Sequence, residues 1–296
     1  MFPIIPANSA AASGNQEGIC GFGGVNTDIT NLVSNAGVVA TDVTGVGTGR
    51  HGVAGCEYGG DKGIFGYGNS GSAVSMSNLV SNAGVVASDT TGVGTARDHL
   101  AACSYGDNKD KGIFGFGIIH ATYTGVTNLV SNAGVVATDT TGVGTIRSGL
   151  AACEYGDDKG IFAYGTDGSF QSMSNLVSNT GVVATDTTGV GTARNAPAAC
   201  DYGGDKGIFG FGYPNTAVTN LVSNVGVIST DVTGVGTVRR NLASCEYGGD
   251  KGIFAFGHGA SGFVSTSNLV SNAGVVSTDV TGVGTARAEI GACSFN

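Results

Sequence analysis

NLVSNAGVVATDVTGVGTGR, residues 31–50, decides the fold because the same stretch returns five more times with few changes. Successive copies start between 45 and 50 residues apart, and a block related to AACEYGGDKGIFGYG separates each copy from the next. The six copies begin at Asn31, Asn78, Asn128, Asn175, Asn220 and Asn268. A period of this length is typical of architectures in which each repeat is one supersecondary unit.

Each repeat contains four short strand candidates separated by turn residues. In the second repeat we expect strands a to d at residues 51–58, 62–68, 74–81 and 85–92, with Gly and Asn in the turns between them. No segment shows the apolar period of a helix. Four antiparallel strands in a unit of this length predict a propeller blade, so we expect an all-β fold, a six-bladed β-propeller.

The phase of the repeat predicts how the array closes. The chain enters the repeats in a strand b, residues 17–23, and ends after a strand a, residues 290–295. Pairing these two segments completes the first blade and removes two exposed strand edges. We therefore expect two regions: an N-terminal arm at residues 1–15, extended or serving as a docking segment, and a propeller at residues 16–296.

Composition excludes several functional classes. The chain holds 54 glycines, no Trp and a net charge of -9, and it lacks a basic stripe. Nucleic-acid binding draws most of its affinity from Lys and Arg, so we expect no nucleic-acid partner. The chain has neither a 20-residue apolar run nor the pattern of a secretory signal, so we expect no membrane insertion.

The order of Arg, small-apolar strand, KGIFGFG strand and NLVSN strand resembles the kelch repeat, although the kelch Trp is absent. NLVSNTGVVATDTTGVGTAR at residues 175–194 and DKGIFGYG at residues 61–68 more closely resemble repeats of virion structural proteins of tailed phages, especially marine ones. This resemblance covers residues 16–296. It implies a tail, tail-fibre or particle protein that is assembled in the host cytoplasm, forms part of a multi-copy virion and has other virion proteins as partners.

Comparison of the six copies within the chain separates constant from variable positions. The b–c loops and the segments after each repeated Arg vary most, and in a four-stranded meander both lie on one face. Loops on rigid scaffolds often carry recognition, so we expect this variable face to bind a host-surface glycan or protein. The alternatives are neutral drift of these loops, or docking through the constant face. The candidate ligand-binding residues are His51, His99, His120, Tyr123, Phe170, Tyr213, Asn215, His258 and Phe263.

One Asp and one Arg recur in every repeat within the pattern Asp-x-x-Gly-x-Gly-Thr-x-Arg. The six Asp and six Arg residues could form a charged central site. Their repetition in every copy instead favours a structural Asp–Arg pair where strand d leads into strand a. Arg suits this role because its planar guanidinium binds carboxylates bidentately. The residues are Asp42, Arg50, Asp89, Arg97, Asp139, Arg147, Asp186, Arg194, Asp231, Arg239, Asp279 and Arg287.

Catalytic and metal sites are the weaker hypotheses. A glycosidase needs an acid and a nucleophile or base at a defined separation, and the unpaired acids of the variable face lie in different repeats, where we expect most of them to be solvated. These are Asp28, Asp98, Asp167 and Glu289. A joint site of His99 and His120 is the best metal hypothesis. The longer a–b turn at residues 107–110 lacks the spacing of a Ca²⁺-binding loop. We expect no enzyme activity, no cofactor and no metal.

Six of the seven cysteines occupy one position of strand a, which predicts small, reduced side chains packed between blades. Cys20 instead replaces the Phe of strand b, and its partner strand carries Cys293. If these two positions face one another, a disulfide would staple the ring; the alternative is a simple replacement of Phe by Cys.

The leading functional hypothesis is a non-catalytic phage virion protein, a component of the tail, tail fibre or surface decoration, that presents its variable loops to a host surface or a virion partner. A secreted bacterial lectin-like propeller and a sialidase-like propeller enzyme are the alternatives.

Overall fold

The computed structural model describes residues 15–295, so the N-terminal arm expected at residues 1–15 lies almost entirely outside the described residues. The chain is an all-β repeat protein of six similar three-stranded antiparallel sheets. The middle strands are β1 (Glu17–Gly21), β4 (Lys62–Gly66), β7 (Lys111–Gly115), β12 (Lys159–Ala163), β15 (Lys206–Gly210) and β18 (Lys251–Ala255). We number the sheets one to six in this order.

The other strands lie on the two sides of these middle strands. The strands that we call inner are β22 (Gly291–Phe295), β3 (Ala54–Tyr58), β6 (Ala101–Tyr105), β11 (Ala151–Tyr155), β14 (Ala198–Tyr202) and β17 (Ala243–Tyr247). The outer strands are β2 (Thr30–Val33), β5 (Ser77–Val80), β10 (Thr127–Val130), β13 (Ser174–Val177), β16 (Thr219–Val222) and β21 (Ser267–Val270). Two b–c loops form small hairpins of their own. One pairs β8 (Ile118–Ile119) with β9 (Thr122–Tyr123), and the other pairs β19 (His258–Gly259) with β20 (Gly262–Phe263).

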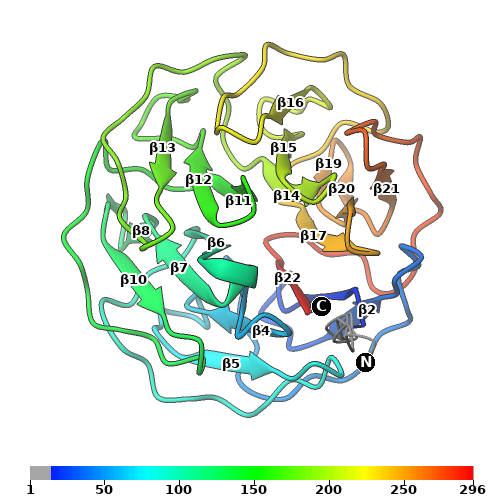
Figure 1. Cartoon of the computed structure of the whole chain (residues 1–296). Coiled ribbons are helices and arrows are strands. Elements are labelled where there is room, and N and C mark those ends of the chain that lie inside the picture. Colours follow the sequence, from blue (N-terminus) through cyan, green and yellow to red (C-terminus); the bar gives the residue numbers. More distant parts are fainter. Residues whose placement is uncertain (1–14, 296) are drawn as a thin grey trace, which may run out of the picture.

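The six sheets are arranged around a common centre, with the inner strands nearest to it (Figure 1). Each inner strand contacts the inner strands of the preceding and following sheets, and β17 contacts β22, so the contacts return to the first sheet. The C-terminal strand β22 pairs with β1 in the register Ile19↔Cys293 and Cys20↔Ala292. The predicted pairing of the first and last segments is therefore confirmed.

The expected fourth strand is not a regular strand. Segment 39–43 makes only two isolated bridges to β2, Val33↔Val39 and Thr30↔Val43. Between them it contains one more residue than β2, which is a β-bulge. At the bulge, side-chain hydrogen bonds of Asn31 connect the segment to β2: its amide donates to the Ala40 carbonyl at 2.9 Å and to Asp42 Oδ1 at 2.9 Å. The same bridges and the same Asn recur in every repeat, so the sheets are three-stranded with a bulged outer segment.

A cycle of backbone hydrogen bonds joins the segments that precede the inner strands. Six amides each donate to the equivalent carbonyl of a neighbouring repeat over 2.7 to 3.0 Å, and the last bond, from Gly52 to Glu289, closes the cycle. The residues are Gly52, His99, Gly149, Ala196, Asn241 and Glu289. All six have positive φ, which is uncommon for residues other than glycine. The cycle explains why His99 and Glu289 accept this conformation.

The repeated cysteines pack between neighbouring sheets. A Cβ atom added to Gly63 of the second sheet would lie 2.3 Å from Cys293 Sγ of the first, and one added to Gly112 of the third sheet would lie 2.5 Å from Cys56 Sγ of the second. The same contact joins the first sheet to the sixth, where Gly18 faces Cys245. The glycine of each KGIF segment therefore leaves room for a thiol, and the expected inter-sheet packing is confirmed.

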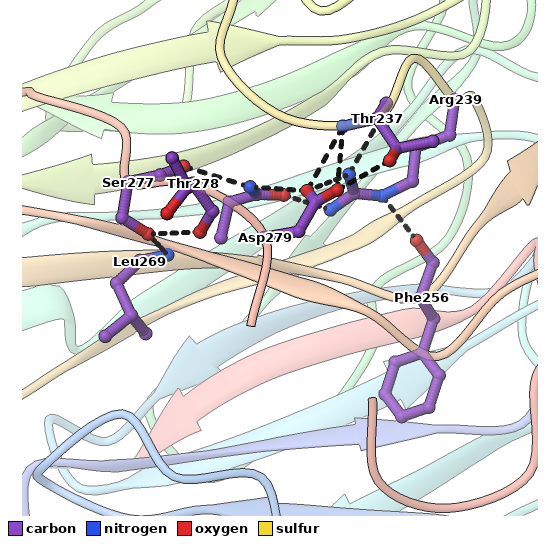
Figure 2. Close-up of polar contacts among 8 residues, drawn as sticks. Thr237, Arg239, Phe256, Leu269, Ser277, Thr278 and Asp279 are labelled. Carbon is purple, nitrogen blue, oxygen red and sulfur yellow. Dashed lines mark hydrogen bonds and ion pairs between the residues drawn. The ribbon is translucent and has the colours of Figure 1, made fainter. Parts of the chain in front are cut away.

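A fully buried arginine follows each sheet, and all but Arg194 donate hydrogen bonds to the next sheet, as Figure 2 shows for Arg239. Its guanidinium donates to the Phe256 carbonyl at 2.9 Å, the Thr237 carbonyl at 3.1 Å and Asn268 Oδ1 at 2.6 Å. Asp279 accepts from the Thr237 amide at 3.0 Å and lies 3.8 Å from Arg239 Nη1. Because Thr237 and Arg239 follow the fifth sheet and the other residues belong to the sixth, the network holds two sheets together.

The arginine also stacks on the sheet that it follows. The Arg239 guanidinium lies 4.3 Å from the ring centroid of Phe211, and all six repeated arginines lie over an aromatic ring in this way. The repeated motif led us to expect an Asp–Arg pair within one repeat. In the structure the partner is the Asp of the next repeat, as in Arg50 with Asp89 at 3.8 Å and Arg287 with Asp42 at 3.9 Å.

The hypothesis of a disulfide between Cys20 and Cys293 is wrong, because its condition is not met. In the β1–β22 register Cys20 stands opposite Ala292, one position away from Cys293, so the two side chains do not face each other. All seven cysteines are free and buried. The Cys20 thiol instead interacts with that of Cys245 on the sixth sheet, and this contact lowers the pKa of Cys20.

No helix among residues 15–295 has the length and apolar character needed to cross a bilayer.

A candidate binding site on the variable face

The b–c loops and the segments after each repeated Arg lie together in the structure. Isolated bridges join them in several repeats, including His51↔Asn69, Asp98↔Ile118 and Arg240↔His258. Each such segment leads into the backbone cycle and then into an inner strand. The variable residues therefore surround one end of the central inner strands, and the a–b turns follow their other end.

Two of the predicted histidines meet in a polar cluster over sheets one to three. The rings of His51 and His99 lie 6.3 Å apart, and Glu289 lies between them, 3.7 Å from His51 Nε2 and 3.6 Å from His99 Nε2. His99 Nδ1 lies 2.8 Å from Asp98 Oδ1, and Asn69 donates to the other Asp98 oxygen at 2.8 Å. We expected most of the four unpaired acids of the variable face to be solvated; Asp98 and Glu289 instead have partners.

The members of the cluster stabilise one another's charged forms. Burial opposes the charged form of His99, but the Asp98 and Glu289 carboxylates outweigh burial and raise its pKa to about 10. Burial also opposes ionisation of the two carboxylates, yet hydrogen bonds from His99 leave the pKa of each below its usual value. The cluster is a set of fixed opposite charges in which neither carboxyl group is available as an acid near neutral pH.

A hollow of about 400 Å³ adjoins this cluster. Its lining comes from the segments before four successive inner strands and from one b–c loop: His99, Ser148, Gly149, Asn195, Ala196, Tyr213, Arg240 and Asn241. Tyr213 is 43 % exposed, and its ring lies beneath the Arg240 guanidinium at 4.9 Å and edge-on to Phe170 at 5.5 Å. Asn215 accepts from Arg240 Nη1 at 3.1 Å, which fixes the cation over the ring.

The remaining predicted residues lie apart from the hollow. His120 and Tyr123 belong to the β8–β9 hairpin, where His120 is exposed and Tyr123 half-buried. His258 packs on Phe263 within the β19–β20 hairpin, with ring centroids 5.5 Å apart. The partners of His99 in the structure are Asp98 and Glu289, so these contacts lend no support to the hypothesis of a joint metal site of His99 and His120.

Sequence reasoning missed most of the polar lining. Arg240, Asn195 and Asn241 occupy the first two positions after the repeated Arg, as do Asp98 and Glu289. These two positions change in chemical type from copy to copy, which marks the segment as variable in sequence. The candidates within it were its histidines, so its Asn and Arg residues were missed. Within residues 15–295 no group of three or more His, Cys, Asp or Glu side chains is arranged to hold a metal ion.

No protein-family model matches the chain, and no curated protein matches it significantly in sequence.

Proposed function

We propose that the chain is a six-bladed β-propeller that acts as a non-catalytic binding component of a tailed-phage particle, in its tail, tail fibre or surface decoration. The six sheets would be its blades, with β22 and β1 as the closing pair. The hollow beside Tyr213 would contact a glycan of the host surface.

The observation that carries the binding proposal is the lining of the hollow. A half-exposed Tyr, an Arg held over it and several amide and hydroxyl side chains combine an apolar surface with directed hydrogen-bonding groups. Small-ligand sites combine apolar or aromatic surface with a few placed polar groups, and Tyr and Arg are, with Trp, the residues enriched among those that dominate binding energy. The rigid backbone cycle beneath the hollow lowers the entropy cost of holding these groups in place.

The charge state of the nearby carboxylates supports a non-catalytic role. Glycosidases need one carboxyl group that remains protonated to act as the general acid. Asp98 and Glu289 both have pKa values below the usual range, so neither supplies that proton.

A glycan array carrying bacterial surface polysaccharides tests the binding proposal. Tyr213→Ala is expected to weaken binding by about tenfold or more, about 1.4 kcal/mol. Phe263→Ala is the matched control, because Phe263 is 44 % exposed on the same face but lies outside the hollow. Equal binding by wild type and Tyr213→Ala, or equal losses in the two variants, would contradict a glycan site in the hollow.

The particle assignment has its own test. Reconstruction and mass spectrometry of purified phage particles are expected to place the chain at a defined position on the tail or capsid. Recovery of the chain only from the medium of uninfected bacteria would favour the secreted lectin-like alternative.

A further inference from the structure

The inner strands carry a second polar ring at the end opposite the variable face. The residue that follows each repeated cysteine is acidic in four sheets and Ser in two, giving Glu57, Ser104, Glu154, Asp201, Glu246 and Ser294. All six line one small central cavity of about 50 Å³ together with the cysteines. Neighbouring members are joined by hydrogen bonds, such as Glu154 N to Asp201 Oδ1 at 2.7 Å and Glu246 N to Ser294 Oγ at 2.9 Å. We call this set the carboxylate ring.

Lys109 enters the carboxylate ring from the a–b turn of the third sheet. Its Nζ lies 3.1 Å from Asp201 Oδ2 and 3.5 Å from Glu154 Oε2, and it also forms an ion pair with Glu246. These three carboxylates belong to the fourth, fifth and sixth sheets, so the lysine reaches across the centre of the array. Its side chain is only 16 % exposed.

The third turn has an unusual backbone that places this lysine. It is two residues longer than its equivalents and forms a 3₁₀ turn, η1 (Asp107–Lys109), with Asn108 and Lys109 both at positive φ. Hydrogen bonds from Gly59 to the Asp110 carbonyl at 2.9 Å and from Gly106 to the Asp158 carbonyl at 2.8 Å connect it to the turns on both sides. A non-glycine residue in a left-handed conformation costs free energy, which indicates that the surrounding contacts impose it.

The charges explain why a cation is needed there. Carboxylates gathered in a small buried space destabilise one another unless a cation compensates them. Burial raises the pKa of Glu57 to about 7 and raises that of Glu154 well above its usual value. Burial opposes the Lys109 charge, but Glu154 and Glu246 outweigh it and raise the lysine pKa.

We propose that the two extra residues of the third turn serve to place Lys109 as a tethered cation in the carboxylate ring, where it closes the centre of the array. The carboxylate ring is then a site for a primary ammonium group, and it takes up a free alkylammonium ion when the lysine side chain is shortened.

Chemical rescue of Lys109→Ala tests this proposal. The variant lacks a propylammonium group, so its thermal midpoint is expected to fall by several degrees and to recover at least half of that loss in n-propylammonium chloride. Tetramethylammonium chloride at the same concentration has the same charge but no N–H donors, and it should not restore the midpoint. Lys111→Ala is the matched control, because Lys111 pairs with Asp110 in the same turn but is 41 % exposed; its midpoint should stay close to wild type in both salts.

The remaining outcomes are also decisive. An unchanged midpoint in Lys109→Ala, or equal recovery in the two salts, would overturn the proposal. If Lys109→Ala does not fold, the double variant Lys109→Ala, Glu246→Gln should fold, because it removes one uncompensated carboxylate. Failure of that double variant to fold would also overturn the proposal.

Discussion

The arginine networks and the polar residues of the variable face occupy neighbouring positions of the repeat but differ in how constant they are across the six copies. Both come from consecutive positions of the same repeat: Arg147 belongs to a network, and Ser148 and Gly149, which follow it directly, belong to the variable face. The arginine contacts both flanking sheets in every copy, so any change would disturb an interface. Of the next two residues, the first pairs its backbone with a b–c loop in most copies and the second contributes its backbone to the cycle, which leaves both side chains free to differ. Positions whose side chain has the same role in every copy remain symmetric, and positions whose shared role lies in the backbone diverge.

The largest expected loss of stability follows from replacing one of the repeated arginines. Arg147→Ala removes bonds to the Tyr164 carbonyl at 2.8 Å and Asn175 Oδ1 at 2.6 Å and leaves a cavity beside Phe116. We expect the free energy of unfolding, measured by urea titration, to fall by about 3–5 kcal/mol, as for loss of one partner of a buried charged network. Arg240→Ala, on the variable face, should cost less than about 1 kcal/mol. Similar losses in the two variants would show that the two regions do not differ in this way.

A smaller effect is expected where two sheets touch through apolar atoms. Gly63→Ala would bring a Cβ to 2.3 Å from Cys293 Sγ, so we expect overpacking to cost about 1–3 kcal/mol in the same titration. Adding Cys293→Ala removes the sulfur and should recover part of that loss. A double variant no more stable than Gly63→Ala alone would place the strain elsewhere.

The smallest effect concerns the charges of the variable face. The folded-state pKa of His99, about 10, lies above its usual value of 6.5. Its contribution to stability is therefore complete below about pH 6.5 and is lost as pH rises toward 10. We expect His99→Gln to be less stable than wild type by up to about 1 kcal/mol at pH 6, because the exposed third of the side chain weakens the pairs, and to equal it near pH 10. A difference that does not change with pH would exclude the His99 charge as its cause.

Much of the fold follows from the repeat. Its period and turn residues predicted six β units, and the phase of the first and last segments predicted the pairing of β1 with β22. The fourth strand is not regular because its segment contains one more residue than the strand it faces, a bulge that period-two alternation does not reveal. The Asp–Arg pair was assigned within one repeat because sequence shows which residues recur but not which copy each of them faces.

The candidate site could be predicted only in outline. The variability of the loops indicated a face, and aromatic and histidine side chains were the visible candidates on it. Glu289 reaches His99 only because the last repeat returns to the first, and Tyr213 meets Arg240 across a loop and a strand connection. Such contacts depend on the angles between sheets, which no local pattern contains.

The sequence by itself determined the local units: apolar and glycine positions recur at fixed spacing, and strand and turn preferences act over a few residues. Only the tertiary structure decided what the irregular residues do. The clearest case is the two-residue insertion in the third turn, which reads as a longer loop in sequence but places Lys109 among carboxylates of three other sheets. Charge compensation acts through space between residues distant in the chain, and it exists only once the sheets surround a common centre.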